Sequence, residues 1–328
     1  MPITVAMYEK SLEHIEERLH ALGLDLEIVT FDKTGQYLVG GLETDPADVS
    51  VDYLWLSSHV NTDSMQREAF DLVLSTKFVG VLQTFNAGLD NPFYKRASKK
   101  GIRICKSSAQ GVAIAEFVLG QVLAIMQPIE VQRQQQADRV WKITRFREIS
   151  RTHWLIVGFG PIGKEVAKRV KAFGAEASVV RRASEPHAIV DRVGTSADLP
   201  AFLPEADVIV LACALNDTTR GMADTAFFDA VKPGAILVNI ARGGLIDDAA
   251  MISALDAGRL ETAILDVFHT EPLPTDDPLW AHPGVRLTPH TSFGGDGVQG
   301  RWDQLFLDNI ARFTRGEPLN QEVNPKDI

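Results

Sequence analysis

The sequence predicts an α/β protein with two parallel-sheet domains and a cleft between them. Three observations support this. The 328 residues exceed the size of a typical single core. Strand and helix signals alternate along most of the chain. One strand–turn–helix–strand unit in the middle carries a glycine-rich turn.

The first hundred residues alternate between apolar strand candidates and amphipathic helices. One helix is expected over Leu12–Leu22, ended by Gly23, and another over Ser64–Leu74. The strand candidates are Ile3–Met7, Leu26–Val29, Val51–Leu56, Val79–Gln83 and Ile102–Cys105. Such alternation is typical of a parallel sheet with helices on its faces.

A long apolar helix and a polar segment follow. Gly111–Met126 is apolar around most of a helical surface, which indicates burial between domains or subunits. Gln132–Glu148 is polar and carries Trp141, so we expect a surface excursion that contacts a second subunit.

The glycine turn is the strongest motif. A strand over Trp154–Val157 leads into a turn, and a helix and the strand Ala177–Val180 come after it. The turn consists of Gly158, Phe159, Gly160, Pro161, Ile162 and Gly163. This is the Rossmann-like unit that binds the pyrophosphate of a dinucleotide at a helix N-terminus.

Later strands complete a second alternating series. They are expected at Val208–Ala212, Ala235–Ile240, Thr262–Val267 and Val285–Thr288. The last helix, near Gln299–Phe313, is expected to return to the first domain. We therefore expect a discontinuous substrate-binding domain, 1–104 plus 292–328, and a dinucleotide-binding domain, 105–291. Both are Rossmann-like or flavodoxin-like.

Composition restricts the partners. The net charge of −10 argues against nucleic acid or an anionic membrane surface. The two cysteines are far apart and form no metal-binding pattern, so no metal is expected. The chain has no apolar stretch of membrane-spanning length and no secretory signal pattern at its start, which fits a cytoplasmic enzyme.

Three polar residues follow three successive strands of the second series. They are Arg242, Glu271 and His290. Ligands in open α/β sheets bind beyond the carboxyl ends of the strands, so these side chains are expected on the dinucleotide side. His290 can donate a proton, Glu271 can favour the protonated imidazole, and Arg242 can bind a carboxylate. Taken singly, each could instead be a surface ion pair or a loop residue.

The ordered motifs GFGPIG, RGGLIDDAAMISAL, LDVFHTEPLP and TPHTS resemble the D-isomer-specific 2-hydroxyacid dehydrogenases. The resemblance implies that Arg242 orients the substrate, His290 is the acid/base and Glu271 pairs with it. It also implies that Asp266 contacts the nicotinamide carboxamide, although a plain structural cap is the alternative. Ala212 and Ala241 complete the expected cofactor contacts.

The resemblance further implies a substrate-carboxylate loop in the first domain. Its residues are Asn86, Ala87 and Gly88, whose backbone N–H groups would bind the carboxylate. An ordinary Asn-Gly turn needs no such function. The chain departs from the family at Cys105–Ser108, where an asparagine or a proline is common, and at Ala212–Leu215, where a proline is common. The resemblance also implies a homodimer, which the apolar helix from Gly111 and the Trp141 excursion would fit.

The end of the second Rossmann strand indicates the cofactor. Arg181, Arg182 and Ser184 stand where an NAD site usually has an acidic residue. Guanidinium groups bind phosphate through paired hydrogen bonds, so NADP(H) is favoured over NAD(H). The alternative is that both arginines are solvated surface charges.

The expected function is NADPH-dependent reduction of a small 2-keto acid, such as glyoxylate or hydroxypyruvate, to the D-2-hydroxy acid. One alternative is an NAD-dependent dehydrogenase of a bulkier 2-hydroxy acid. Another is a dinucleotide-sensing corepressor or scaffold without turnover. Phosphoglycerate oxidation is less expected, because the chain leaves no room for an added regulatory domain.

Overall fold

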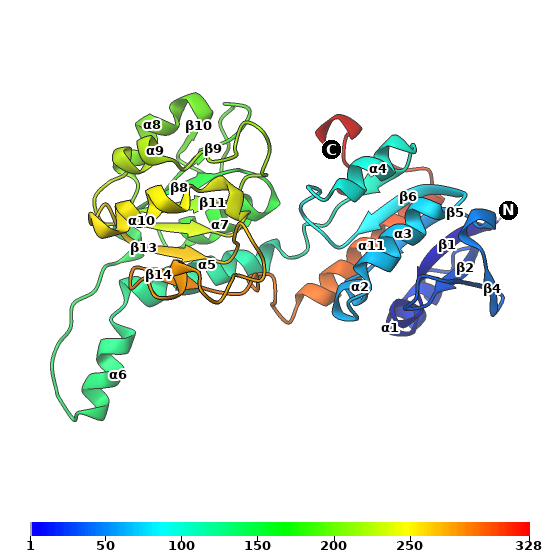
Figure 1. Ribbon diagram of the computed structural model, residues 1–328, viewed down its shortest axis with the longest axis horizontal. Helices are drawn as coiled ribbons and strands as arrows, with labels where there is room; N and C mark the ends of the chain where they lie inside the picture. The colour runs from blue at the N-terminus through cyan, green and yellow to red at the C-terminus, as the bar shows by residue number, and fades with distance from the viewer. Residues whose placement is uncertain (1) are drawn as a thin grey trace. The chain divides into compact units, whose positions relative to one another are not determined.

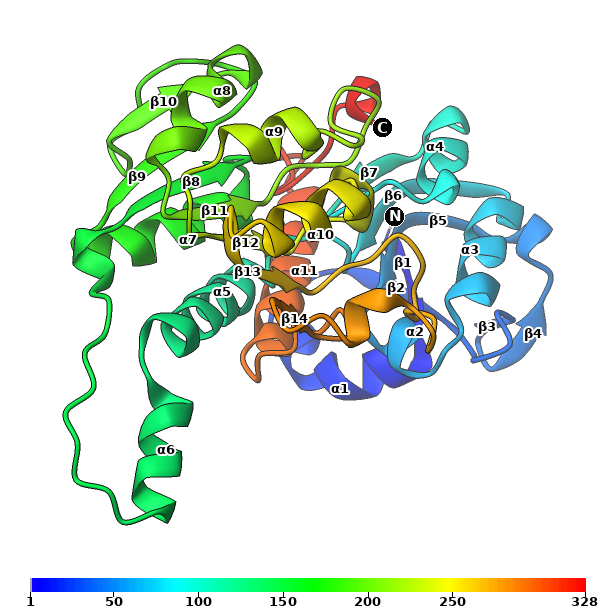
Figure 2. The same cartoon turned by 60° about the vertical axis from the view of Figure 1, so that its left-hand side comes forward.

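Two seven-stranded sheets, each covered by helices, organise the chain (Figures 1 and 2). The computed structural model describes residues 2–328. Unit 1 runs to Gln110 and resumes at Asp296–Ile328, and unit 2 comprises Gly111–Gly295. The predicted α/β class with two sheet domains is confirmed.

The sheet of unit 1 has the strand order β4-β3-β2-β1-β5-β6-β7. Its parallel strands are β1 (Ile3–Tyr8), β2 (Leu26–Phe31), β5 (Ser50–Leu56), β6 (Phe78–Thr84) and β7 (Arg103–Cys105). The order β2-β1-β5-β6-β7 is that of flavodoxin-like sheets. The five predicted strands of this domain are therefore all present.

Helices cover both faces of this sheet. On one face lie α3 (Gln66–Ser75) and α4 (Pro92–Lys99), with Phe70 stacked on Phe93. On the other lie α1 (Glu9–His20) and α11 (Val298–Thr314). Trp55 of β5 stacks on Phe306 of α11 at 4.2 Å between ring centroids. The last helix thus belongs to unit 1, together with the first 110 residues.

An antiparallel hairpin at the sheet edge was not predicted. It consists of β3 (Tyr37–Val39) and β4 (Leu42–Thr44), joined by Gly40 and Gly41. Both glycines have positive φ, 58° and 82°, which a two-residue hairpin turn of this twist requires. The Gly-Gly pair between short apolar runs was the signal in the sequence.

All strand pairs in unit 2 are parallel, and the order is β10-β9-β8-β11-β12-β13-β14. The strands are β8 (His153–Val157), β9 (Glu176–Val180), β10 (Arg192–Gly194), β11 (Val208–Leu211), β12 (Ala235–Asn239), β13 (Leu260–Leu265) and β14 (Val285–Leu287). Across the sheet, the strands run backward in sequence from β10 to β8 and then forward from β11 to β14. The strand order therefore reverses between β8 and β11, and Rossmann folds bind dinucleotides at such a switch point.

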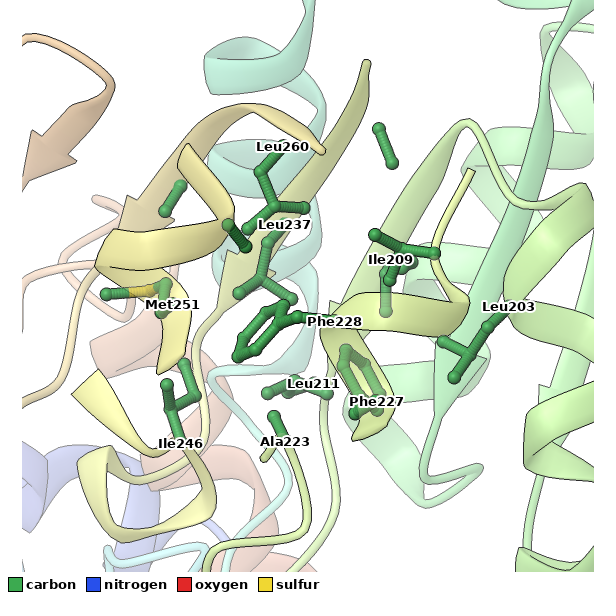
Figure 3. Packing of buried hydrophobic residues seen from close by; sticks show 14 of the residues in the cluster. Leu203, Ile209, Leu211, Ala223, Phe227, Phe228, Leu237, Ile246, Met251 and Leu260 are labelled. Atoms are coloured by element: carbon green, nitrogen blue, oxygen red, sulfur yellow. The ribbon is translucent and has the colours of Figure 1, made fainter. Parts of the chain in front are cut away.

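Alternate residues of these strands face two separate cores. On one face, α5 (Gly111–Met126) and α7 (Pro161–Ala172) pack on the sheet. On the other face lie α9 (Thr225–Ala230), α10 (Asp248–Asp256) and the short helix α8 (Leu199–Phe202). Figure 3 shows Phe228 and Met251 against Leu237 of the sheet. Because both faces are covered, the strands are almost wholly apolar.

The segment after α5 projects from the rest of unit 2 as an arm (Figures 1 and 2). It consists of α6 (Ile129–Ala137) and the extended residues 138–148. The predicted surface excursion is confirmed, but it begins with a helix that was not predicted. Trp141 and Ile143 on the arm are 102% and 89% exposed.

No single helix in residues 2–328 is long and apolar enough to cross a membrane. Helices α5 and α6 satisfy that test only as a pair, which is bent by 55°.

Candidate active site

The glycine turn is formed by backbone segments that leave no space for side chains. Gly158 follows β8 with φ of +105°, and a Cβ there would lie 2.6 Å from the carbonyl carbon of Ala212. A Cβ on Gly163 would overlap the carbonyl oxygen of Gly158. Only glycine fits either position. The turn therefore brings the ends of β8 and β11 and the start of α7 together.

The first turn of α7 is suited to an anion. Gly160 is the N-cap and Pro161 the first helical residue, and a Cβ added to Gly160 would meet nothing within 4 Å. By helix geometry, the N–H groups of Ile162 and Gly163 have no carbonyl partner within the helix. These open N–H groups beside a side-chain-free backbone fit the pyrophosphate of a dinucleotide. Phe159 is buried, and the Lys164 ammonium lies 5.8 Å from its ring centroid.

Arg181 and Arg182 lie directly after β9, as predicted. Arg181 is three-quarters buried: its Nε donates to the carbonyl oxygen of Ala183 at 2.7 Å. Its Nη2 donates to Oε2 of Glu185 at 2.9 Å. Arg182 and Ser184 are exposed, and Ser184 lines an open cavity of about 320 Å³ together with His187. The sequence analysis did not consider Glu185.

Glu271 and His290 form a hydrogen-bonded pair. Oε2 of Glu271 lies 2.7 Å from Nδ1 of His290, and Oε1 accepts from the backbone N–H of Phe268 at 2.9 Å. An ionised carboxylate can only accept, so Nδ1 of the imidazole carries a hydrogen. Nε2, on the other side of the ring, is left to act on a substrate. Both side chains remain partly exposed, His290 at 43% and Glu271 at 36%.

The loop that carries His290 is held by Asp266, which is fully buried after β13. Its Oδ1 accepts from Oγ1 of Thr288 at 2.6 Å and from the N–H of Thr291 at 2.8 Å. Its Oδ2 accepts from the N–H of Ser292 at 3.0 Å. Between these anchors His290 has φ of 49°, the left-handed region that few side chains adopt. The contacts present are those of a structural cap, and the contact with a nicotinamide stays a prediction.

Arg242 lies after β12 in a loop whose backbone is held by hydrogen bonds to the side chain of Asn239. Buried Asn239 donates through Nδ2 to the carbonyl oxygen of Arg242 at 2.9 Å and accepts from the N–H of Ala241 at 3.1 Å. Nη1 of Arg242 donates to the carbonyl oxygen of Ala241 at 2.6 Å, among its other interactions. A Cβ on Gly243 would overlap the backbone of Phe268 and His269. The loops that carry Arg242 and Glu271 are therefore in direct backbone contact.

Ala212 follows β11 at the switch point, where its N–H donates to the carbonyl oxygen of Val157 at 2.8 Å. Its neighbour Cys213 is partly exposed, and its Sγ lies 3.9 Å from Sδ of Met222. Burial raises the pKa of the Cys213 thiol to about 11, so it is a protonated thiol at neutral pH. The side chain at this position is therefore polarisable and uncharged.

The predicted substrate loop lies in unit 1, after β6. Buried Tyr94 of α4 accepts from Nδ2 of Asn86 at 2.6 Å, and its hydroxyl lies 2.9 Å from Oγ1 of Thr84. The backbone N–H of Ser107 donates to the carbonyl oxygen of Asn86 at 2.8 Å. Burial raises the pKa of Tyr94. The side-chain amide and the carbonyl oxygen of Asn86 are thus both hydrogen-bonded within unit 1, and these bonds fix the loop.

A second contact fixes the other side of the loop. Nε1 of Trp302 in α11 donates to the carbonyl oxygen of Phe85 at 3.1 Å, and the two rings meet edge to face. The N–H groups of Ala87 and Gly88 have no acceptor among residues 2–328. The arrangement leaves two backbone donors available for an anion.

Sequence reasoning missed polar groups beside this loop. Strands β5 and β6 are paired so that Leu56 lies opposite Thr84, which places Ser57, Ser58 and His59 next to the loop. Oγ of Ser57 lies 2.5 Å from Oγ of Ser11, and Oγ of Ser58 donates to Oε1 of Gln299 at 2.5 Å. Three polar residues directly after a buried strand were the available signal. Within the described part of the chain, no three His, Cys, Asp or Glu residues are placed to hold a metal ion.

Comparison with known proteins gives a consistent result. Residues 119–292 match the model of the D-isomer specific 2-hydroxyacid dehydrogenase, NAD binding domain. The chain is 27% identical over 311 residues to a hydroxypyruvate reductase of Blautia hydrogenotrophica, covering 92% of each. It is 30% identical over 263 residues to a D-3-phosphoglycerate dehydrogenase of Methanocaldococcus jannaschii, covering 79% of this chain. The chain spans about half the length of that dehydrogenase.

A solved structure agrees over the whole chain. The D-isomer specific 2-hydroxyacid dehydrogenase family protein of Aeromonas salmonicida is 28% identical, with a TM-score of 0.79, and the match covers 99% of this chain and 100% of that one. The family resemblance seen in the sequence motifs is confirmed by the family model and by this structure. The chain belongs to the D-isomer-specific 2-hydroxyacid dehydrogenase family and has its NAD(P)-binding domain.

Proposed function

We propose that this protein reduces a small 2-keto acid of the glyoxylate or hydroxypyruvate type to the D-2-hydroxy acid, with NADPH as the reductant. The observation that carries the proposal is the Glu271–His290 pair, 2.7 Å apart in the unit that contains the glycine turn. A positioned imidazole near a dinucleotide site provides the proton that reduction of a ketone requires. The hydroxypyruvate reductase of Blautia hydrogenotrophica, matched over 92% of both chains, supports the substrate class.

Each residue has a defined part in this mechanism. The bound dinucleotide supplies the hydride. Nε2 of His290 donates a proton to the carbonyl oxygen, while Glu271 stabilises the imidazolium and fixes the ring through Nδ1. Phe268 fixes Glu271 in turn through its backbone N–H. The guanidinium of Arg242 pairs with the substrate carboxylate or carbonyl oxygen.

The loop of unit 1 is the second part of the proposal. We infer that the N–H groups of Ala87 and Gly88 bind the substrate carboxylate, because these donors lack acceptors within residues 2–328. Tyr94 and Trp302 hold the loop in place from opposite sides. Unit 1 is thus the substrate-binding domain and unit 2 the dinucleotide-binding domain.

The choice of NADP(H) rests on the end of β9. Arg181 and Arg182 place two guanidinium groups where an acidic residue would accept the ribose 2′-hydroxyl of NAD. A 2′-phosphate would form charge-assisted hydrogen bonds with these groups, and Ser184 can add a hydroxyl. A cellular NADPH pool favours reduction as the working direction.

We also propose a cytoplasmic homodimer that assembles through the arm. Trp141, Ile143 and Phe146 are exposed on it, and a run of exposed apolar side chains marks an interaction surface. Two copies of one chain pair most simply about a twofold axis. Two unpaired cysteines, Cys105 and Cys213, are in keeping with a reducing compartment.

His290→Ala should lower kcat for glyoxylate reduction by about 10²- to 10⁴-fold, because the proton donor is lost. Glu271→Gln should lower kcat by about tenfold or more, since the negative charge is lost and the amide has one acceptor oxygen for two donors, the Nδ1–H of His290 and the N–H of Phe268. Steady-state NADPH oxidation measures both. Asp256→Asn, which alters the separate His282–Asp256 pair, is the control. Unchanged kcat in His290→Ala would refute the role of His290 as the proton donor. No turnover of any 2-keto acid by the wild type would support a dinucleotide-sensing binding protein instead.

Arg181→Asp should raise the Kd of NADP⁺ much more than that of NAD⁺, by about tenfold or more, because a phosphate-binding cation becomes an anion. Fluorescence or calorimetric titration gives both constants. Lys168→Asp makes the same charge change on α7 and should alter neither constant selectively. Equal changes for the two dinucleotides would refute the NADP(H) assignment.

Tyr94→Phe should raise the KM for the keto acid by about three- to tenfold with kcat changed less than twofold. The loss of one hydrogen bond to Asn86 loosens the loop that holds the carboxylate. Kinetics at saturating NADPH separate the two parameters. Tyr37→Phe removes another buried hydroxyl of unit 1, bonded to Thr76, and should change neither. A fall in kcat alone would contradict the proposed role of the loop.

Trp141→Asp combined with Ile143→Asp should convert a dimer to a monomer, because two charges would be buried in the proposed interface. Analytical ultracentrifugation measures the mass. Leu42→Asp, at an exposed apolar residue of the β3–β4 hairpin, should leave the dimer intact. A monomeric wild type, or a dimer that both changes leave intact, would show that the arm is not the interface.

A further inference from the structure

The Arg181 guanidinium already has an anionic partner. Its Nη2 donates to Oε2 of Glu185 at 2.9 Å, while its Nε donates to the carbonyl oxygen of Ala183. The two residues are four apart in the loop after β9. Glu185 is 73% exposed, whereas Arg181 is largely buried. The carboxylate therefore occupies the solvent side of the guanidinium, the side from which a phosphate would approach.

Glu185 is charged at neutral pH. A hydrogen bond from its own backbone N–H, together with the one from Arg181, lowers the pKa of its carboxyl group. The group thus presents a full negative charge beside the proposed 2′-phosphate position.

Two other Arg–Glu pairs of unit 2 connect separate elements. Arg192 of β10 reaches Glu205 of the short 3₁₀ turn Leu203–Glu205. Arg169 of α7 reaches Glu116 of α5. The Arg181–Glu185 pair closes only one exposed loop and joins no two elements of the fold. Its loss therefore removes little from the packing of the unit, and its effect falls on ligands that need Arg181.

We propose that Glu185 is a specificity-determining residue that competes with the 2′-phosphate of NADP(H) for Arg181. The proposal rests on the proposed NADP(H) function of Arg181. A 2′-phosphate that takes the place of the carboxylate on Nη2 must displace it, and one that binds through Nη1 still lies close to that anion. Glu185 thereby weakens the binding of NADP(H) and leaves the binding of NAD(H) unaffected. The preference of the protein for NADP(H) over NAD(H) is therefore smaller than it would be without Glu185.

Glu185→Gln tests this by a gain of affinity, which a misfolded variant cannot mimic. The Kd of NADP⁺ should fall by about two- to fivefold, the size expected when an exposed ion pair is removed. The Kd of NAD⁺ should change by less than about 1.5-fold. Titration calorimetry on the full chain measures both without turnover. The difference in the Kd of NADP⁺ between the wild type and Glu185→Gln should shrink at about 0.5 M salt, because exposed charges are then screened.

Two further variants locate the effect. Glu205→Gln removes a carboxylate that pairs with Arg192 rather than with Arg181, and it should change neither constant. In an Arg181→Ala background, Glu185→Gln should lose its effect, since the two residues act through one contact. An unchanged or higher Kd of NADP⁺ in Glu185→Gln, or an equal gain in the Arg181→Ala background, would overturn the inference.

The two proposals fail in different ways. If Arg181→Ala raises the Kd of NADP⁺ but Glu185→Gln has no effect, the competition is wrong and the NADP(H) assignment stands. If Arg181→Ala leaves the Kd of NADP⁺ unchanged, the assignment of Arg181 is wrong and the inference about Glu185 fails with it.

Discussion

A single buried carboxylate, Asp266, holds the catalytic loop together. Its three hydrogen bonds go to Thr288, Thr291 and Ser292, which flank His290. A histidine with φ of 49° is unfavourable on its own and persists because its neighbours are fixed. Glu271 adds an independent restraint on the ring through Nδ1. The direction of Nε2, and with it the proposed proton transfer, therefore depends on a carboxylate that needs no contact with the substrate.

The parallel sheet of unit 2 gives these contacts their location. Every strand ends at the same edge, so the glycine turn after β8 and the loops after β12 and β13 belong to one side of the sheet. Gly158 and Gly243 let backbone segments meet where any side chain would collide. The same edge carries Arg181 after β9, which is paired with Glu185, and we propose that Glu185 competes there with a phosphate. Affinity and specificity thus come from loops on a rigid apolar sheet.

Much of this could be predicted from the sequence. The long strands, the helix Gly111–Met126 and the glycine turn have strong periodicity or composition, and the structure has them at those positions. Residue types at successive strand ends made Glu271 a candidate partner of His290, and the family resemblance implied that the two residues pair. The hairpin at Gly40 and Gly41 escaped because strands of three residues show almost no alternation. The helix of the arm escaped because none of its residues is buried, so it has no apolar face to detect.

The contacts that orient the site were beyond sequence reasoning. Tyr94 reaches Asn86 and Trp302 reaches Phe85 from helices that tertiary packing alone brings to the loop. Asp266 could be named from its motif, but the choice between cofactor contact and cap depends on which donors surround it. Glu185 is an ordinary loop residue until the position of the Arg181 side chain is known.

The most direct test of the central claim is a substrate panel for the wild-type protein. Initial rates with glyoxylate, hydroxypyruvate and bulkier 2-keto acids, each with NADPH and NADH, give kcat/KM for every pair, and chiral chromatography identifies the hydroxypyruvate product. We predict that kcat/KM is highest for glyoxylate and hydroxypyruvate with NADPH. We also predict that the product of hydroxypyruvate reduction is the D-hydroxy acid. Higher kcat/KM for a bulky keto acid with NADH, or an L-hydroxy acid, would contradict it.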